Sequence, residues 1–220
     1  MSLASYGHAR QHQLSPWEPE PGSVRALKAK IRRLEALNKD LLRELNRKES
    51  YEVSAASKVV IESSHEVIET LNLQIKRLSQ DIDNDINSDP TLKKNSELLK
   101  SIKGIGPVVS RQMVSLFATK QFNNAKQVAA YLGLIPRLNE SGTLKGKVTL
   151  TKKGPAMLRA KLYMAAIVAT NHNPDFIVLK RRLIARGKSK MAALCAAMRK
   201  LVQVCFGMIK HQSEYVPQVT

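Results

Sequence analysis

The sequence predicts a mainly α-helical protein, in which a long helical coiled coil is followed by a small helical domain. Three observations predict this fold class. Residues 23–90 repeat apolar side chains at alternating spacings of three and four, the seam of a coiled coil. Residues 91–220 hold apolar segments at helical spacing, separated by glycine or proline. Strand-like alternation occurs only in TLKGKVTLT, residues 143–151, which predicts one short hairpin.

Residues 1–22 are predicted to be a flexible, proline-rich lead-in. They are polar, and three prolines fall within six residues of SPWEPEPG. Proline favours extended backbone and stops a helix from crossing such a stretch.

Residues 23–90 are predicted to form a coiled coil or a helical hairpin. Asn38 occupies one seam position in the first run, where a buried Asn commonly sets register. No glycine or proline separates the two runs, so one long helix or two helices joined by a bend are both open. Such a coil would pair the chain with a copy of itself or with another part of an assembly. The apolar seam residues are Val24, Leu27, Ile31, Leu34, Leu41 and Leu45, then Ile61, Ile68, Leu71, Ile75, Leu78 and Ile82.

The acidic stretch DIDNDINSD, residues 81–89, raises the question of a calcium loop. Such a loop needs glycine at its sixth position and Glu at its twelfth, where this chain has Ile86 and Leu92. We therefore expect a solvated helix end and linker. The histidines and the two cysteines lack metal-ligand spacing, so no metal site is expected in this chain.

The charge of the chain is strongly positive and uneven. Lys and Arg total 36 against 18 acids, and residues 141–220 hold 15 cations against Asp175 and Glu214. This imbalance predicts that the C-terminal part binds a polyanion, nucleic acid first of all. Anionic membrane is the rival, but no apolar run approaches the roughly 20 residues that span a bilayer, so no membrane partner is expected. Cys195 and Cys205 are interpreted as small buried residues in a reducing cytoplasm.

Residues 98–117 match the helix–hairpin–helix pattern that contacts nucleic-acid backbones. Gly104 and Gly106 flank one apolar residue between two apolar helices, and Lys103 and Arg111 lie on either side. Backbone N–H groups at the start of the second helix suit a phosphate oxygen. The alternative is an ordinary helix–turn–helix corner that binds nothing.

The loop LGLIPRLNESGTLKGK, residues 132–147, places Ser141 among cations. Serine becomes a nucleophile when a base takes its proton or cations stabilise the charge that develops. Asn-Glu-Ser-Gly is also an ordinary turn, and a basic loop can bind DNA without cutting it. The cations that could support the chemistry or bind phosphate are Arg137, Lys145, Lys147, Lys152, Lys153 and Arg159.

The densest cationic stripe is RRLIARGKSK, within a basic helix and the glycine loop that follows it. A charge run is often a solvated face, but here it adds to a domain already far out of balance, which favours contact with phosphates. The residues predicted to bind are Arg181, Arg182, Arg186, Lys188 and Lys190.

Four blocks in order resemble one family. They read L-x-S-I-x-G-I-G, Q-x-A-A-Y-x-G-L-x-P-R-x-x-E-S-G, K-x-G-x-x-x-L-R-x-x-L-Y-M-A-A and A-x-M-R-K-L. Over about residues 91–220 the chain resembles the C-terminal transposase domain of the one-ten family of insertion-sequence transposases, relatives of the Piv/MooV DNA invertases. The upstream heptads and the PWEPEP segment resemble that family's coiled coil and the segment before it.

The resemblance implies a function. In that family the serine of the E-S-G block attacks DNA and forms a covalent phosphoserine, and that serine falls on Ser141. It also implies a structured guide RNA, homo-oligomers through the coiled coil, and a cytoplasmic, nucleoid-associated place in a bacterium. The family's Mg²⁺ is held by an N-terminal RuvC-like domain with a DEDD site.

Two departures qualify what the resemblance implies. Nothing in residues 1–90 resembles the RuvC-like domain, so a truncated transposase that needs that domain in trans, or from a full-length transposase, is expected. Mg²⁺ is expected only in that domain. The family often has Ser where this chain has Thr151. The alternative function is a non-catalytic nucleic-acid-binding or regulatory fragment that pairs with full-length transposase.

Overall fold

The computed structural model describes residues 3–12, 21–137, 140–141, 143–146 and 148–218, and it confirms a mainly α-helical fold. A short helix that the sequence analysis did not predict, α1 (Leu3–Ala9), lies in the N-terminal lead-in. The Arg10 N–H donates to the Tyr6 carbonyl at 3.1 Å, and the guanidinium of Arg10 lies 5.2 Å from the Tyr6 ring centre. These local contacts extend one turn past α1. Trp17 lies outside the described residues.

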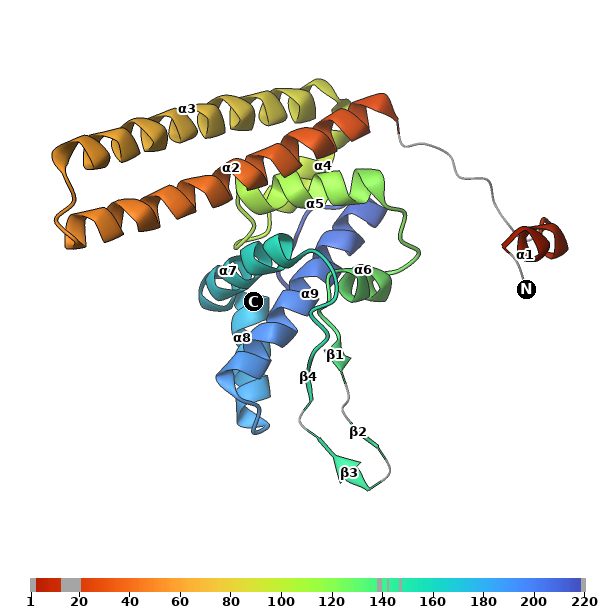
Figure 1. The fold of residues 1–220 in the computed structure, drawn as a ribbon. Coiled ribbons are helices and arrows are strands. Elements are labelled where there is room, and N and C mark those ends of the chain that lie inside the picture. Colours follow the sequence, from red (N-terminus) through yellow and green to blue (C-terminus); the bar gives the residue numbers. More distant parts are fainter. Residues whose placement is uncertain (1–2, 13–20, 138–139, 142, 147, 219–220) are drawn as a thin grey trace.

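Two long helices form an antiparallel hairpin that projects from the rest of the molecule (Figure 1). They are α2 (Gly22–Val53) and α3 (Lys58–Ser88), joined by a short turn in which Ala55 has a φ of 51°. At the end of the hairpin near the body, Leu27 and Ile31 of α2 pack against Ile82 and Ile86 of α3. Burial of this apolar cluster holds the two helices together.

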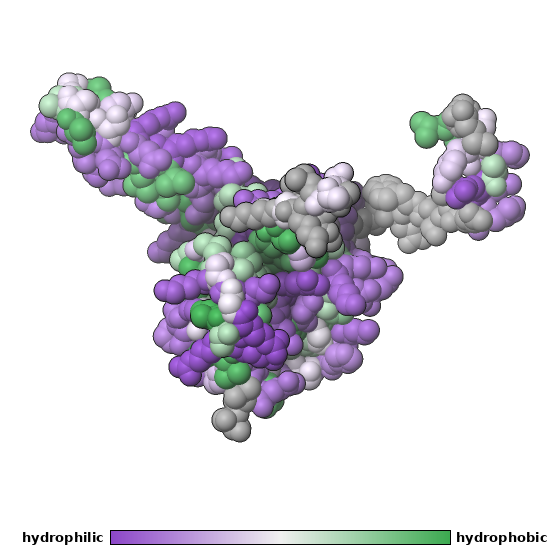
Figure 2. Space-filling view, turned by 90° about the horizontal axis from the view of Figure 1, so that it is seen from below, coloured by the Kyte–Doolittle hydropathy of each residue, from purple (hydrophilic) through white to green (hydrophobic). Residues whose placement is uncertain are grey.

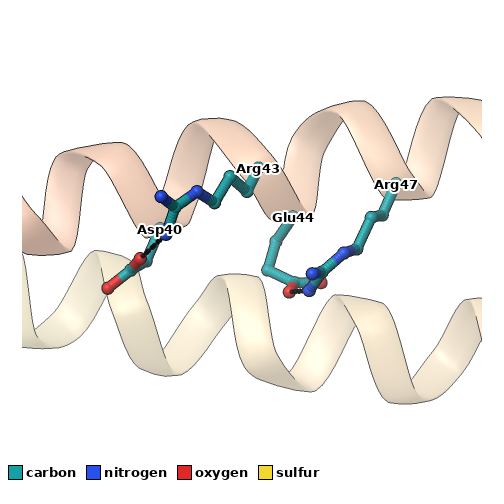
Figure 3. Close-up of polar contacts among 4 residues, drawn as sticks. All are labelled: Asp40, Arg43, Glu44 and Arg47. Atoms are coloured by element: carbon teal, nitrogen blue, oxygen red, sulfur yellow. Dashed lines mark hydrogen bonds and ion pairs between the residues drawn. The ribbon is translucent and has the colours of Figure 1, made fainter.

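Farther from the body, fewer of the seam side chains are buried between α2 and α3. Asn38 is exposed, and its side-chain amide donates to the Leu34 carbonyl at 2.7 Å, so the expected buried Asn is not found within this chain. Polar pairs within α2 follow, Asp40 with Arg43 and Glu44 with Arg47 (Figure 3). Hydrophobic patches remain uncovered along the projecting hairpin (Figure 2). The more exposed of these side chains are Leu42, Leu45, Val53, Val59, Val67 and Leu73.

The acidic stretch at residues 81–89 pairs α3 with α2 and caps the helix that follows. α3 continues through it to Ser88, and Lys30 of α2 reaches Asp85 at 2.8 Å and Asp81 at 3.5 Å. The hydrogen bond to Asp85 raises the pKa of Lys30. Asp89 caps the next helix, because its carboxylate accepts from the N–H groups of Thr91 at 2.8 Å and Leu92 at 3.0 Å.

The body consists of shorter helices around one hydrophobic core. They are α4 (Pro90–Lys100), α5 (Pro107–Thr119), α6 (Ala125–Tyr131), α7 (Ala156–His172), α8 (Pro174–Ala185) and α9 (Lys190–His211). α9 contacts α4, α6, α7 and α8. Its inward face carries Leu201, Val202 and Cys205, all fully buried, and burial raises the pKa of the Cys205 thiol to about 12. The core therefore forms around α9.

α9 is longer and more apolar than the sequence analysis allowed. Among the described residues it is the one helix whose length and composition would suffice to cross a membrane. Its apolar positions have an internal use, because Ala193, Ala197, Met198 and Met208 also point into the core. Packing of the core explains the composition of this helix.

After α9, the C-terminal segment packs back over the body. The Tyr215 hydroxyl donates to Asp175 Oδ2 at 2.6 Å and lies 2.8 Å from Asn173 Oδ1. The Tyr215 N–H donates to Ser101 Oγ at 3.3 Å. Burial and the bond to Asp175 raise the pKa of Tyr215 to about 12. The segment thus links the start of α8 to the turn after α4.

Candidate nucleic-acid interface and its serine

Ser141 lies on a two-stranded ribbon that projects from the helical body (Figure 1). At the base, β1 (Pro136–Arg137) pairs antiparallel with β4 (Thr149–Leu150), with Arg137 opposite Thr149. Farther out, β2 (Glu140–Ser141) pairs with β3 (Leu144–Lys145), with Ser141 opposite Leu144. Ser141 is exposed and lies beside the outer turn. Its hydroxyl is therefore presented away from the core.

Of the six cations predicted to support Ser141, four lie in two groups along the ribbon. The backbone of Lys145 lies one residue pair from Ser141, and Arg137 is exposed near the middle of the ribbon. Lys152 and Lys153 are exposed at the base, where the strand returns to the body. The distance along the strand from Thr151 to Leu144, the residue opposite Ser141, is roughly 20 Å at about 3.3 Å per residue. Lys147 lies outside the described residues.

Arg159 has a different place from the one predicted. It lies in the first turn of α7, and its Nη1 donates to the Leu132 carbonyl at 3.2 Å, so the side chain is held at the junction between ribbon and body. Lys161, two residues farther along α7, lies 3.6 Å from Glu35 of α2. Burial lowers the pKa of Lys161, and Glu35 opposes that shift.

The two glycines in the turn between α4 and α5 have different roles. Gly104 has a φ of 115°, and a Cβ there would lie 2.8 Å from the Ala165 carbonyl oxygen of α7. Glycine is thus required for close packing against α7. Gly106 has open space around it, and both it and Lys103 are exposed. Lys103 and Gly106 remain accessible to a phosphate, while Arg111 is bonded to Asp83 of α3.

The strongest basic surface lies at the turn between α8 and α9. Gly187 closes α8 with a φ of 77°, and Ser189 caps α9 by accepting from the Ala192 N–H at 3.2 Å. In Figure 1, this turn and the ribbon project from the same side of the body, opposite the α2–α3 hairpin. Five exposed cations lie on the end of α8, in this turn and at the start of α9, namely Arg181, Arg182, Arg186, Lys188 and Lys190.

The positive charge of Lys152, at the base of the ribbon, acts on a residue of α9. Burial raises the pKa of Cys195 in the first turns of α9, and the positive charge of Lys152 acts against that shift. Lys152 is therefore close to α9. The ribbon base and the basic turn between α8 and α9 form one cationic side of the body.

The structure also shows a polar cluster where the hairpin meets the body. Gln112 of α5 donates to Glu35 of α2 at 2.6 Å, and its Oε1 is buried without a hydrogen-bond partner. A pocket of about 230 Å³ lies beside it, lined in part by Val108 and Lys161. Sequence analysis missed this cluster because Glu35 and Gln112 lie far apart in the chain. The signal available was a Gln on an otherwise apolar helix face.

The residues described here do not suit a Mg²⁺ site. Within this part of the chain, no group of three or more His, Cys, Asp or Glu side chains could hold a metal ion. Asp81, Asp83 and Asp85 of α3 are paired with Lys30 and Arg111.

The chain is similar in sequence to known transposases and DNA-inverting proteins. Residues 96–180 match the family model described as the transposase IS116/IS110/IS902 family. The chain is 29% identical over 218 residues to the pilin gene-inverting protein of Moraxella bovis, covering 97% of this chain and 65% of that protein. The pilin gene-inverting protein of Moraxella lacunata gives the same identity and coverage. A probable family 20 transposase of Pseudomonas aeruginosa is 31% identical over 100 residues, covering 45% of this chain and 28% of that protein.

The match to the family model begins in α4 and ends in α8, so it includes the turn at Gly104, the whole ribbon with Ser141, and α7. The chain spans about two thirds of the length of the pilin gene-inverting proteins. Over residues 96–180 this chain is therefore similar to the IS116/IS110/IS902 transposase family.

Proposed function

We propose that this chain acts in DNA transposition or inversion, with Ser141 as the nucleophile that cleaves a DNA strand. The observation that carries the proposal is the position of Ser141, exposed on a projecting ribbon on the same side of the body as the exposed cations between α8 and α9. A duplex bound to those cations would lie beside the ribbon. The family match and the similarity to pilin gene-inverting proteins support the same class of reaction.

The proposed step is a transesterification. Ser141 Oγ attacks a backbone phosphorus, an Oγ–P bond forms, and one P–O bond to a deoxyribose oxygen breaks. The serine proton passes to a base, and the leaving oxygen takes a proton from solvent. The product is a phosphoserine that joins protein and DNA. Phosphoryl transfer depends mainly on positioning and on positive charge near the phosphorane.

Arg137 is the described side chain best placed to supply that charge. It ends β1, four residues before Ser141 in the sequence, and is exposed. The backbone of Lys145 lies near Ser141 across the ribbon. Lys152 and Lys153 are at the base, so we assign them to binding of DNA at a distance from the cleaved phosphate.

The partners are proposals of the same kind. The exposed cations suit DNA and also a structured guide RNA, because both present closely spaced phosphates. The uncovered apolar side chains of the hairpin, among them Leu42 and Leu45, suit a second copy of the chain or a full-length transposase. We also propose that an acidic, metal-binding domain acts together with this chain.

A second function is favoured by one observation. Lys152 and Lys153, at the base of the ribbon, are separated from Ser141 by roughly 20 Å of strand. Cations at that distance suit binding of DNA more than its cleavage. In that case the chain would be a non-catalytic nucleic-acid-binding or regulatory protein.

Covalent capture separates the two functions. The chain is mixed with supercoiled DNA and with a full-length family member whose own nucleophilic serine is replaced by alanine. We expect a protein–DNA adduct that contains this chain and is lost in Ser141→Ala. DNA binding without any adduct would favour the non-catalytic function.

A further inference from the structure

We propose that Thr151 is a positioning residue for Ser141, because its hydroxyl fastens the base of the ribbon to the helical body. This inference rests on the proposed role of Ser141. It concerns the junction where the two strands of the ribbon leave the body and return to it. That junction lies between α6 and α7.

The Thr151 side chain bonds directly across this junction. Its Oγ1 donates to the Ile135 carbonyl at 2.8 Å, and its backbone N–H donates to the same carbonyl at 3.0 Å. One oxygen of the outgoing strand thus accepts two hydrogen bonds from one residue of the returning strand. The next residue, Lys152, donates its N–H to the Gly133 carbonyl at 3.2 Å.

The outgoing strand is firmly attached to the body at this point. Leu132 and Leu134 are fully buried, and the Leu134 N–H donates to the Ala129 carbonyl of α6 at 2.8 Å. Arg159 of α7 donates to the Leu132 carbonyl. The strand is therefore held from both adjoining helices, so a bond to Ile135 is a bond to the body.

The backbone of the returning strand lies so close to that of the outgoing strand that there is no room for a Cβ at two positions. A Cβ on Gly133, where φ is 67°, would lie 2.3 Å from the Lys153 carbonyl oxygen. A Cβ on Gly154, where φ is 113°, would lie 2.1 Å from the Tyr131 carbonyl oxygen. Lys152 itself has a φ of 54°, which non-glycine residues rarely adopt. Such a conformation persists only where the surrounding contacts determine it.

The length of the ribbon makes this junction important for Ser141. A tilt of about 10° at the base would move a group roughly 20 Å away by about 3 Å, given about 3.3 Å per strand residue. A misplacement of about 1 Å at a reacting group can reduce a rate about 100-fold. Side-chain hydroxyls that bridge two backbone segments hold them in one relative orientation. The geometry therefore assigns Thr151 the role of fixing the direction in which the ribbon projects. Its hydroxyl proton is already donated to the Ile135 carbonyl.

Distance measurements between spin labels test the orientation without any chemistry. Labels are attached to cysteines at Thr143 on the ribbon and Lys200 on α9, both exposed, in a chain where the half-buried Cys195 is replaced by Ala. Cys205 is fully buried and can stay. We expect one narrow distribution for Thr151 and for Thr151→Ser, and a broader or shifted one for Thr151→Val and Thr151→Ala. Identical distributions in all four proteins would overturn the inference.

The rate of adduct formation tests the consequence for Ser141, again in the reaction complemented by a full-length family member. Thr151→Val should slow the adduct at least about 10-fold with unchanged DNA affinity, and Thr151→Ser should restore the rate. A normal rate in Thr151→Val would overturn the positioning role. If even the unsubstituted chain forms no adduct, the proposed function of Ser141 fails, and the label distances decide the anchoring role of Thr151 independently.

Discussion

Arg111 of α5 and Asp83 of α3 form a two-bond ion pair, with Nε donating to Oδ1 at 2.7 Å and Nη2 to Oδ2 at 2.6 Å. The Arg111 side chain is 15% exposed. Sequence analysis placed Arg111 among the phosphate-binding residues because it follows the glycine turn. In the structure its donors connect the hairpin to the body, so its role is to hold these two parts together.

Arg111→Ala should therefore lower the free energy of unfolding and leave nucleic-acid binding nearly unchanged. Loss of two charge-assisted hydrogen bonds from a largely buried side chain should cost roughly 2 kcal/mol, measured by urea denaturation. Arg181→Ala, on the exposed basic turn, is the matched control and should do the reverse. A stable Arg111→Ala protein with weakened DNA binding would restore the sequence-based assignment.

The exposed pair Arg181 and Arg182 should contribute to phosphate binding. The matched pair Lys76 and Arg77 is equally adjacent and also exposed, but lies on α3. Each phosphate contact adds about 0.9 to the slope of log affinity against log salt concentration on duplex DNA. Replacing Arg181 and Arg182 by Gln should reduce the slope by about 1 to 2, and replacing Lys76 and Arg77 should not. Equal changes from both pairs would mean that net charge, not this surface, determines binding.

Gly133 and Gly187 both have positive φ, but they differ in the space around them. Gly187→Ala has nothing within 4 Å of the added Cβ, so it should cost only the conformational strain, about 1–2 kcal/mol. Gly133→Ala would also bring the Cβ within 2.3 Å of the Lys153 carbonyl oxygen, and roughly 3 kcal/mol or more is expected. Chemical denaturation of both variants measures the difference. Equal losses would show that the ribbon base is less tightly packed than described.

The contact of Tyr215 with Asp175 should make stability fall at alkaline pH. The pKa of Tyr215 is raised in the folded state from 10.0 to about 12, so the folded chain holds this proton more tightly than the unfolded chain. The stabilisation is complete below pH 10 and is lost as the pH rises toward 12. Urea denaturation across this range should show a steeper loss in the unsubstituted chain than in Tyr215→Phe, while tyrosinate absorbance reports the ionisation. Parallel curves for the two proteins would contradict the raised pKa.

The helices followed from local patterns, and their contacts did not. The short hairpin expected within residues 143–151 was wrong in extent, because that segment is only the returning arm of the ribbon and pairs with residues 136–141. The spacing of Leu27, Ile31 and Ile82 predicts packed helices, and the glycine at residue 187 predicts the end of one. The pairing of Arg111 with Asp83 joins residues that lie 28 apart, and no local pattern specifies it. Likewise, the role of Gly104 depends on the approach of α7. Long-range contacts of this kind depend on the whole packing of the chain.

The candidate site was likewise predicted in its residues but not in how they are arranged. Sequence analysis identified Ser141 and its surrounding cations, but treated Arg137, Lys152 and Arg159 as one group. An antiparallel ribbon separates residues that are close in sequence, because each strand residue adds about 3.3 Å. Arg159 therefore supports the base of the ribbon, while Arg137 lies farther along it.

Mapping the amino acid that carries DNA after the complemented reaction tests the central claim most directly. The adduct is trapped, the protein is digested, and the peptide bearing the nucleotide is identified by mass spectrometry. We predict that Ser141 carries the phosphodiester, and that Ser141→Ala abolishes the adduct while folding and DNA affinity stay nearly the same. An adduct that survives Ser141→Ala and maps to Thr151 or Tyr163 would contradict this account.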